Sequence, residues 1–185
     1  MTRLGLATAL ALARTQINVV VASRGGASEV VDNIIESGGE AISVQLDVAD
    51  LSSIEAARVA VLAGIEQEWN ASTIDVLVNN AGTGFWAPFA NQDLAGLQRD
   101  IDLNVTALTT LSHGFIKRAQ AHGKRSYLMN VASLAGSLPT PQYATYSGTK
   151  GYVRFFTEIL DYELRDSPIS VTAACPGGVL TPFLD

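Results

Sequence analysis

The sequence alternates short apolar runs with longer stretches of helical spacing, and this alternation leaves few possible folds. The apolar runs have the length of strands and occupy residues 17–23, 41–46, 74–78, 126–131 and 169–174. The helical spacing is found at residues 4–14, 27–37, 51–69, 93–122 and 143–165. Apolar strands separated by helices are typical of βαβ crossovers and of a parallel sheet covered on both faces. The sequence therefore predicts a doubly wound α/β fold of three layers (αβα), in a single domain over residues 1–185.

The composition excludes several classes of protein. Of the 185 residues, 48% are apolar and 16% are charged, which excludes a disordered or fibrous chain. The net charge of −6 would repel a phosphate backbone, so no nucleic-acid partner is expected. Cys175 is the one cysteine, and with only His113 and His122 beside it the chain has too few ligands for a zinc site; no metal is expected. The apolar stretch at 1–13 is too short for a membrane span, so we expect a cytoplasmic protein.

Polar or turn-forming residues follow each of the five apolar runs. They are Ser23-Arg24, Asp47-Val48, Asn79 to Gly82, Ser133, and Pro176 to Gly178. Ligands of open parallel sheets bind at the carboxyl ends of the strands, so this distribution predicts a ligand site there. Strands commonly end in polar turns, and any one of these positions alone would indicate little.

Tyr146 and Lys150 are four residues apart in a predicted helix and therefore lie on the same helix face. A cation within about 4–6 Å favours the ionised form of a tyrosine, whose ordinary pKa is near 10. Such a phenol can protonate a carbonyl oxygen or deprotonate an alcohol near neutral pH. Most pairs with this spacing are ordinary surface neighbours, so the interpretation depends on the rest of the sequence.

Five motifs in order make the chain resemble the short-chain dehydrogenase/reductase family, which has a Rossmann-like fold. Asn79-Asn80-Ala81-Gly82 matches the family's NNAG motif, and Tyr146 with Lys150 matches its YxxxK motif. Ser133 precedes the tyrosine by the usual thirteen positions. The remaining matches are the helix asparagine Asn104 and a PGxxxT segment at Pro176, Gly177 and Thr181.

The resemblance implies hydride transfer between a nicotinamide and a small-molecule carbonyl or secondary alcohol, such as a ketone or a 3-oxoacyl compound. It implies that Tyr146 is the general acid or base and that Ser133 orients the substrate oxygen. Lys150 would lower the pKa of the tyrosine and bind the nicotinamide ribose, and Asn104 would hold a water of the proton relay. The alternatives are a catalytically silent member of the family, or an unrelated doubly wound protein such as a methyltransferase.

The resemblance also implies which residues bind the cofactor. They are Gly5, Ser23, Arg24, Asp47, Val48, Asn79, Ala81, Gly82, Tyr146, Lys150, Pro176, Gly177 and Thr181. Arg24 stands where NAD-specific sheets place a carboxylate, and a guanidinium can bind a 2′-phosphate that a carboxylate would repel. We therefore predict NADP(H) rather than NAD(H). Trp86 and Phe89 follow the NNAG motif and could belong to the core or border the substrate.

Two further expectations concern association and the ends of the chain. The apolar positions of the helix at 143–165 cover a wider arc than one sheet face needs, which predicts a homodimer or homotetramer through this helix and that at 93–122. Family members begin with a strand and a TGxxxGxG turn, of which only Gly5 aligns, and they continue beyond Asp185. We expect the first strand and the C-terminal strand to be missing, the strands at 17–23 and 74–78 to keep unpaired edges, and activity to be impaired.

Overall fold

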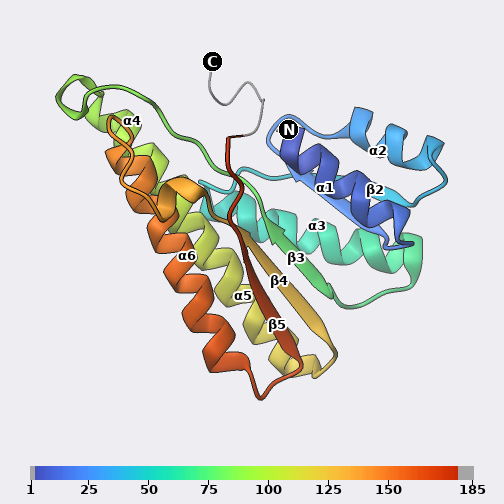
Figure 1. The fold of residues 1–185 in the computed structure, drawn as a ribbon. Helices are drawn as coiled ribbons and strands as arrows, with labels where there is room; N and C mark the ends of the chain where they lie inside the picture. Colours follow the sequence, from blue (N-terminus) through green and yellow to red (C-terminus); the bar gives the residue numbers. More distant parts are fainter. Residues whose placement is uncertain (1–2, 179–185) are drawn as a thin grey trace. The chain divides into compact units, whose positions relative to one another are not determined.

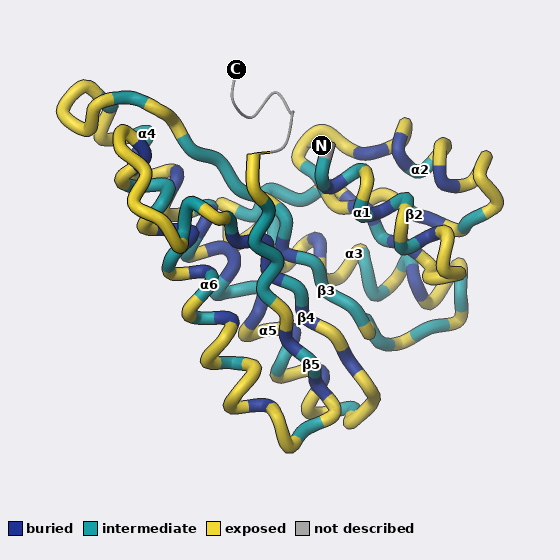
Figure 2. The backbone as a smooth tube through the Cα atoms, in the orientation of Figure 1, coloured by how far each residue is buried: buried dark blue, intermediate teal, exposed yellow. Residues whose placement is uncertain are grey.

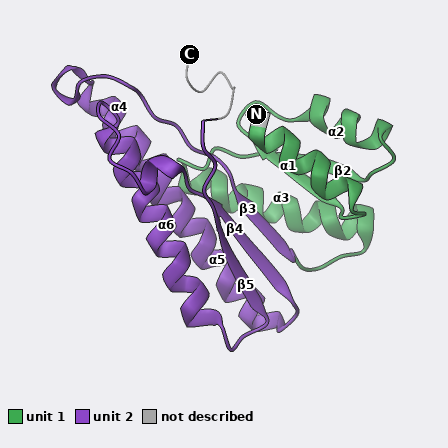
Figure 3. Cartoon of the chain, viewed as in Figure 1, with its two compact units in different colours: residues 1–73, 184–185 green, residues 74–183 purple. Residues whose placement is uncertain are grey.

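The computed structural model describes residues 3–178. These residues form two compact units, divided between Thr73 and Ile74 (Figure 3). Each unit has its own sheet and its own core. The single domain expected from the sequence stays a prediction.

The first unit consists of helices on both faces of a two-stranded parallel sheet. Its elements are α1 (Arg3–Arg14), β1 (Val19–Ser23), α2 (Ser28–Glu36), β2 (Ala41–Gln45) and α3 (Leu51–Trp69). Alternate strand residues, among them Val19 and Val21, pack against α1 and α2 in one core. Ile42 points to the other face and contacts α3 at Gly64. The carboxylate of Asp50 accepts a hydrogen bond from the backbone N–H of Ser52 at 2.8 Å, which caps α3.

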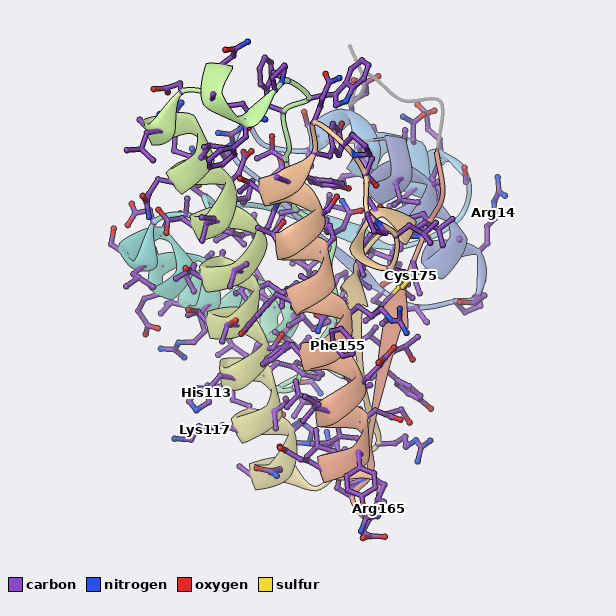
Figure 4. The ribbon with its side chains drawn as sticks, turned by 60° about the vertical axis from the view of Figure 1, so that its left-hand side comes forward. Arg14, His113, Lys117, Phe155, Arg165 and Cys175 are labelled. Atoms are coloured by element: carbon purple, nitrogen blue, oxygen red, sulfur yellow. The ribbon has the colours of Figure 1, made fainter. Side chains whose placement is uncertain are left out.

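The second unit has a three-stranded parallel sheet in the order β3-β4-β5. Its elements are β3 (Val76–Asn79), η1 (Phe89–Asn91), α4 (Leu94–Ile101), η2 (Asp102–Ala107), α5 (Leu108–His122), β4 (Ser126–Val131), η3 (Leu134–Gly136), α6 (Ala144–Leu164) and β5 (Ile169–Ala174). Helices α5 and α6 lie side by side on one face of this sheet (Figures 1 and 4). Their apolar faces and the strands form a core that includes Phe115, Leu128 and Val171 (Figure 2). On the opposite face Tyr127 and Thr172 are exposed, and no described helix of this unit covers them.

The strands form two separate sheets. Among residues 3–178, β1 pairs only with β2, and β3 pairs only with β4 at its edge. Each of these two strands therefore has one edge without a neighbouring strand, as expected for residues 17–23 and 74–78. Both strands are slightly shorter than predicted at the start, since β1 begins at Val19 and β3 at Val76.

One predicted helix is interrupted. The region at 93–122 contains two α-helices joined by a π-helical turn, η2, in place of one uniform helix. A π-helical turn accommodates an extra residue without ending the helix, and such turns are frequent at functional sites. This turn contains Asn104, which lies in the candidate site of the second unit.

Candidate active site

Helix α6 places Tyr146 and Lys150 on one face, one turn apart, as the spacing predicts. Lys150 is only 4% exposed, and its Nζ donates a hydrogen bond of 2.7 Å to the carbonyl oxygen of Val131, the last residue of β4. The same Nζ lies 5.8 Å from the centroid of the Tyr146 ring. The end of β4 therefore holds the lysine beneath the tyrosine.

Tyr146 is enclosed by Ser133 and Tyr143. The Ser133 side chain hydrogen-bonds Tyr146, and the Tyr143 ring stands edge-on to the Tyr146 ring with centroids 5.0 Å apart. Burial raises the pKa of Tyr146 above its ordinary value of 10, and the hydrogen bond with Ser133 partly opposes this rise. The expected lowering of the Tyr146 pKa by Lys150 stays a prediction. The lysine ammonium donates its hydrogen bond to Val131. The loss of solvent around the phenol is the largest cause of the raised pKa of Tyr146.

Burial also lowers the pKa of Lys150 from its ordinary 10.5 to about 8. Between these two values the folded chain binds fewer protons than the unfolded chain, so stability increases as the pH rises through this window. From pH 7.5 to 9.5 we expect the unfolding free energy to rise by about 2 kcal/mol more in the unsubstituted protein than in Lys150→Met. Urea unfolding at both pH values measures this difference, and equal slopes for the two proteins would contradict it. The raised pKa of Tyr146 lowers stability only above pH 10, outside the window.

Asn104 connects the segment after β3 to helix α6. Its Oδ1 accepts a hydrogen bond from the N–H of Thr83 at 2.9 Å, and its Nδ2 donates to the carbonyl oxygen of Thr83 at 2.7 Å. The same Nδ2 donates to Oγ1 of Thr149 at 3.0 Å, and Thr149 donates to the carbonyl oxygen of Tyr146. The side chain of Asn104 thus fixes the loop after the NNAG motif against the helix that carries Tyr146. A water held by Asn104 stays a prediction.

Two glycines that the sequence reasoning did not select allow the close approach of backbone to this site. A Cβ on Gly84 would lie 2.8 Å from Cγ of Tyr146, so the loop packs directly on the tyrosine ring. A Cβ on Gly136 would lie 2.5 Å from the carbonyl carbon of Lys150, so η3 packs directly on the backbone of α6. No local pattern marks these glycines, because their neighbours are distant in the sequence.

A buried polar network supports the site from below. Nδ2 of Asn79 donates to Oδ1 of Asn130 at 2.9 Å and to Oγ of Ser112 at 3.1 Å. Nδ2 of Asn130 donates to Oγ1 of Thr157 at 3.0 Å. All four side chains are buried, so the Asn79 amide makes its hydrogen bonds within the core. Its role in binding a cofactor stays a prediction. Asn130, Ser112 and Thr157 were not selected from the sequence.

The other expected cofactor residues divide between the two units. In the first unit Gly5 lies in the first turn of α1, Ser23 ends β1, Arg24 is exposed, and Asp47 and Val48 follow β2. In the second unit Ala81 is exposed, Gly82 lies against Asn104 and Lys150, and Pro176 accepts a hydrogen bond from the N–H of Leu134. Gly177 lies against the Leu134 side chain. Thr181 lies outside the described residues.

Comparison with known proteins places these features in a family. The family model for short chain dehydrogenases matches residues 2–185. A 3-oxoacyl-[acyl-carrier-protein] reductase from Synechocystis sp. is 36% identical over 98% of this chain and 72% of its own length. Glucose 1-dehydrogenase 2 from Bacillus subtilis is 31% identical over 96% of this chain and 68% of its own length.

Solved structures agree with this placement. A protein solved as an NAD(P)-dependent gluconate 5-dehydrogenase from Beutenbergia cavernae, with bound NADP, has a TM-score of 0.83 and 29% identity. That alignment covers 98% of this chain and 70% of the other. An actinorhodin polyketide ketoreductase variant with NADPH has a TM-score of 0.86 and 30% identity, covering 98% and 68% of the two chains. The chain belongs to the short-chain dehydrogenase family and is an oxidoreductase that acts on a CH–OH group with NAD(P).

Two further findings concern residues 3–178. No helix in that range is long and apolar enough to cross a membrane. No group of three or more His, Cys, Asp and Glu side chains gathers there in a way that could hold a metal ion. His113, one of the two histidines, is exposed on α5 (Figure 4).

Proposed function

We propose that this chain is an NADP(H)-dependent reductase of ketones, which transfers hydride between the nicotinamide and a carbonyl or secondary alcohol. The observation that carries the proposal is the cluster of the half-buried Tyr146 and Ser133 with the buried Lys150. The phenol is hydrogen-bonded to a hydroxyl that can also bind a carbonyl oxygen, and an ammonium lies beneath it. This is the arrangement that general acid catalysis at a carbonyl requires.

The raised pKa of Tyr146 suits the role of general acid in the reduction of a carbonyl. Near neutral pH the phenol keeps its proton, so Tyr146 can donate this proton to the developing alkoxide. Ser133 orients and polarises the carbonyl oxygen through its hydroxyl. Lys150, with a pKa of about 8, is still mostly protonated at pH 7 and can supply positive charge beneath the phenol.

The chemistry of the donor groups fits a dinucleotide phosphate. When bound, the nicotinamide supplies the hydride, a step that no side chain can perform. In the second unit Lys150 offers an ammonium for the ribose hydroxyls. In the first unit Arg24 is exposed and makes no ion pair with a described carboxylate, so its guanidinium can receive a 2′-phosphate.

The direct test is the oxidation of NADPH, followed by the loss of absorbance, with a panel of ketones and 3-oxoacyl thioesters. The proposal expects turnover with at least one compound of the panel. Binding of NADPH without turnover on any of them would favour the catalytically silent alternative instead.

Arg24→Ala should weaken NADPH binding by about tenfold or more and leave NADH binding nearly unchanged. The reason is that a hydrogen bond to a charged phosphate contributes about 1.5–3 kcal/mol, whereas NADH has no phosphate at that position. Titration by calorimetry measures both affinities. Arg14→Ala, which removes an exposed arginine from α1 of the same unit, is the matched control (Figure 4). Equal losses for the two cofactors would contradict the role of Arg24.

Helix α6 carries an apolar stripe that we propose as the contact with a second copy of the chain. The stripe consists of Tyr152, Phe155, Ile159 and Tyr162, which are spaced by three and four residues and exposed. Phe155 is labelled in Figure 4. It borders α5, since the Tyr152 hydroxyl and Oγ1 of Thr109 are 2.9 Å apart. Exposed apolar patches of this kind commonly mark protein interfaces.

Ile159→Asp should convert the dimer or tetramer to monomers at micromolar concentration, because a carboxylate would be buried in the apolar interface. Analytical ultracentrifugation measures the association state. Ile35→Asp is the control, since Ile35 on α2 is 54% exposed and Ile159 is 56% exposed. An unsubstituted protein that is monomeric, or an Ile159→Asp protein that still associates, would contradict the proposal.

A further inference from the structure

Exposed apolar side chains gather on two segments of the second unit that follow β3 and β4. We call them the aromatic rim, and they are Phe85, Trp86, Phe89, Leu94, Leu134 and Leu138. Trp86 is 64% exposed and Phe85 is 65% exposed, although aromatic side chains of this size are usually buried. The concentration of several such side chains on two neighbouring segments indicates a binding surface rather than scattered surface residues.

The two segments of the rim are bound to each other. The N–H of Ala87 donates to the carbonyl oxygen of Gln142 at 3.1 Å, and Nε1 of Trp86 donates to the carbonyl oxygen of Pro141 at 3.3 Å. Gln92 bridges them through Nε2, which donates to Ala87 at 2.6 Å and to Gln142 at 3.4 Å. These bonds fix the indole ring of Trp86 in orientation, so the rim is preorganised.

The rim is continuous with the catalytic tyrosine. Gly84, the residue before Phe85, packs on the Tyr146 ring, and Tyr143 packs edge-on against the same ring. Tyr143 also directly follows Gln142, whose carbonyl oxygen accepts the hydrogen bonds from Ala87 and Gln92. A molecule whose carbonyl oxygen meets Tyr146 therefore has its remaining atoms near the rim.

The rim has almost no charge. Residues 83–94 and 134–146 include no Lys, no Arg and a single charged residue, Asp93. Its carboxylate caps α4 by accepting hydrogen bonds from the N–H groups of Ala95 and Gly96, and it lies 3.7 Å from Nη2 of Arg99. From α6, Nη1 of Arg154 donates to Oγ of Ser137 at 2.8 Å, and this guanidinium is paired with Glu158. A substrate with a carboxylate or phosphate on its body would find no cation within these segments to compensate its loss of water.

From these observations we propose that the aromatic rim binds the uncharged, ring-containing body of the ketone substrate. The class of substrate is then a bulky neutral cyclic or aromatic ketone, rather than a sugar acid or a phosphate-bearing thioester. Flat rings suit this surface because indole and phenyl side chains bind them by stacking and by apolar burial. This inference rests on the proposed reductase function, and it names the substrate class of the same site.

The first test measures the binding of a ketone without turnover. Trp69→Phe removes the other tryptophan, so the fluorescence of this variant reports on Trp86 alone. 1-Tetralone, a neutral bicyclic ketone, should quench this fluorescence with saturation, whereas its carboxylated derivative should bind at least tenfold more weakly. N-acetyltryptophanamide is the control for collisional quenching. Equal affinity for the two compounds would overturn the inference, and so would fluorescence that changes with protein concentration but not with ketone, which would indicate a second copy on the rim.

The second test measures substrate specificity. Trp86→Ser should lower kcat/KM for 1-tetralone at least tenfold, mainly through KM, and lower that for 2-butanone less than threefold. Tyr127→Ser removes an exposed aromatic ring from the start of β4, at the end of the strand remote from Val131, and should change neither value. Equal losses for the two ketones in Trp86→Ser would overturn the inference. Saturable binding of 1-tetralone without NADPH oxidation would support the inference while contradicting the proposed reductase function.

Discussion

Replacement of Tyr146 by Phe should lower kcat for ketone reduction by about 10³-fold, because the variant loses the proton that the carbonyl oxygen receives. The ring packs against Gly84 and stands edge-on to Tyr143, contacts that do not use the hydroxyl, so the ring should stay in place without it. KM for the ketone should therefore change little. Steady-state NADPH oxidation by purified Tyr146→Phe measures both constants.

Tyr127→Phe is the matched control for this change. Tyr127 lies on β4, is exposed, and stacks under Arg125 with 5.4 Å from Cζ to the ring centroid. Its hydroxyl is remote from the candidate site, so kcat should be that of the unsubstituted protein. A Tyr146→Phe protein that keeps more than a tenth of the activity would show that another group supplies the proton.

The fold was predictable where local patterns determine it. The bounds of α3, β4 and β5 agree residue by residue with the segments expected from apolar runs and helical spacing. The π-helical turn at Asp102–Ala107 was not predictable, because its residues have the same periodicity as the helices on either side. Its extra residue is stabilised by the contacts of Asn104 with Thr83 and Thr149, which are made across the fold.

The candidate site was also predictable where local patterns determine it and not where contacts across the fold do. Asn104, Ser133, Tyr146 and Lys150 were found from motif spacing, and the structure brings them together around the first turns of α6. The protonation of Tyr146 was not predictable, since an i, i+4 pair indicates only that a cation is near. Burial of the phenol, which depends on packing across the fold, determines the sign of the pKa shift.

Gly136→Ala should destabilise the protein by about 2 kcal/mol and also remove most of its activity. The added methyl group would lie 2.5–2.7 Å from backbone atoms of Lys150 and Gly151, which cannot rotate away as a flexible side chain could. Relief requires η3 to move off α6. Ser133 caps η3 by accepting a hydrogen bond from the N–H of Ala135, so this movement carries Ser133 away from Tyr146.

Gly148→Ala on α6 is the control, because a Cβ there meets no described atom within 4 Å and a helical alanine adds about 0.5–1 kcal/mol of stability. Urea unfolding should therefore show a lower unfolding free energy for Gly136→Ala and a higher one for Gly148→Ala. NADPH oxidation should show a loss of activity only in Gly136→Ala. If Gly136→Ala were as stable and as active as Gly148→Ala, the close contact between η3 and α6 would not be what holds Ser133 against the tyrosine.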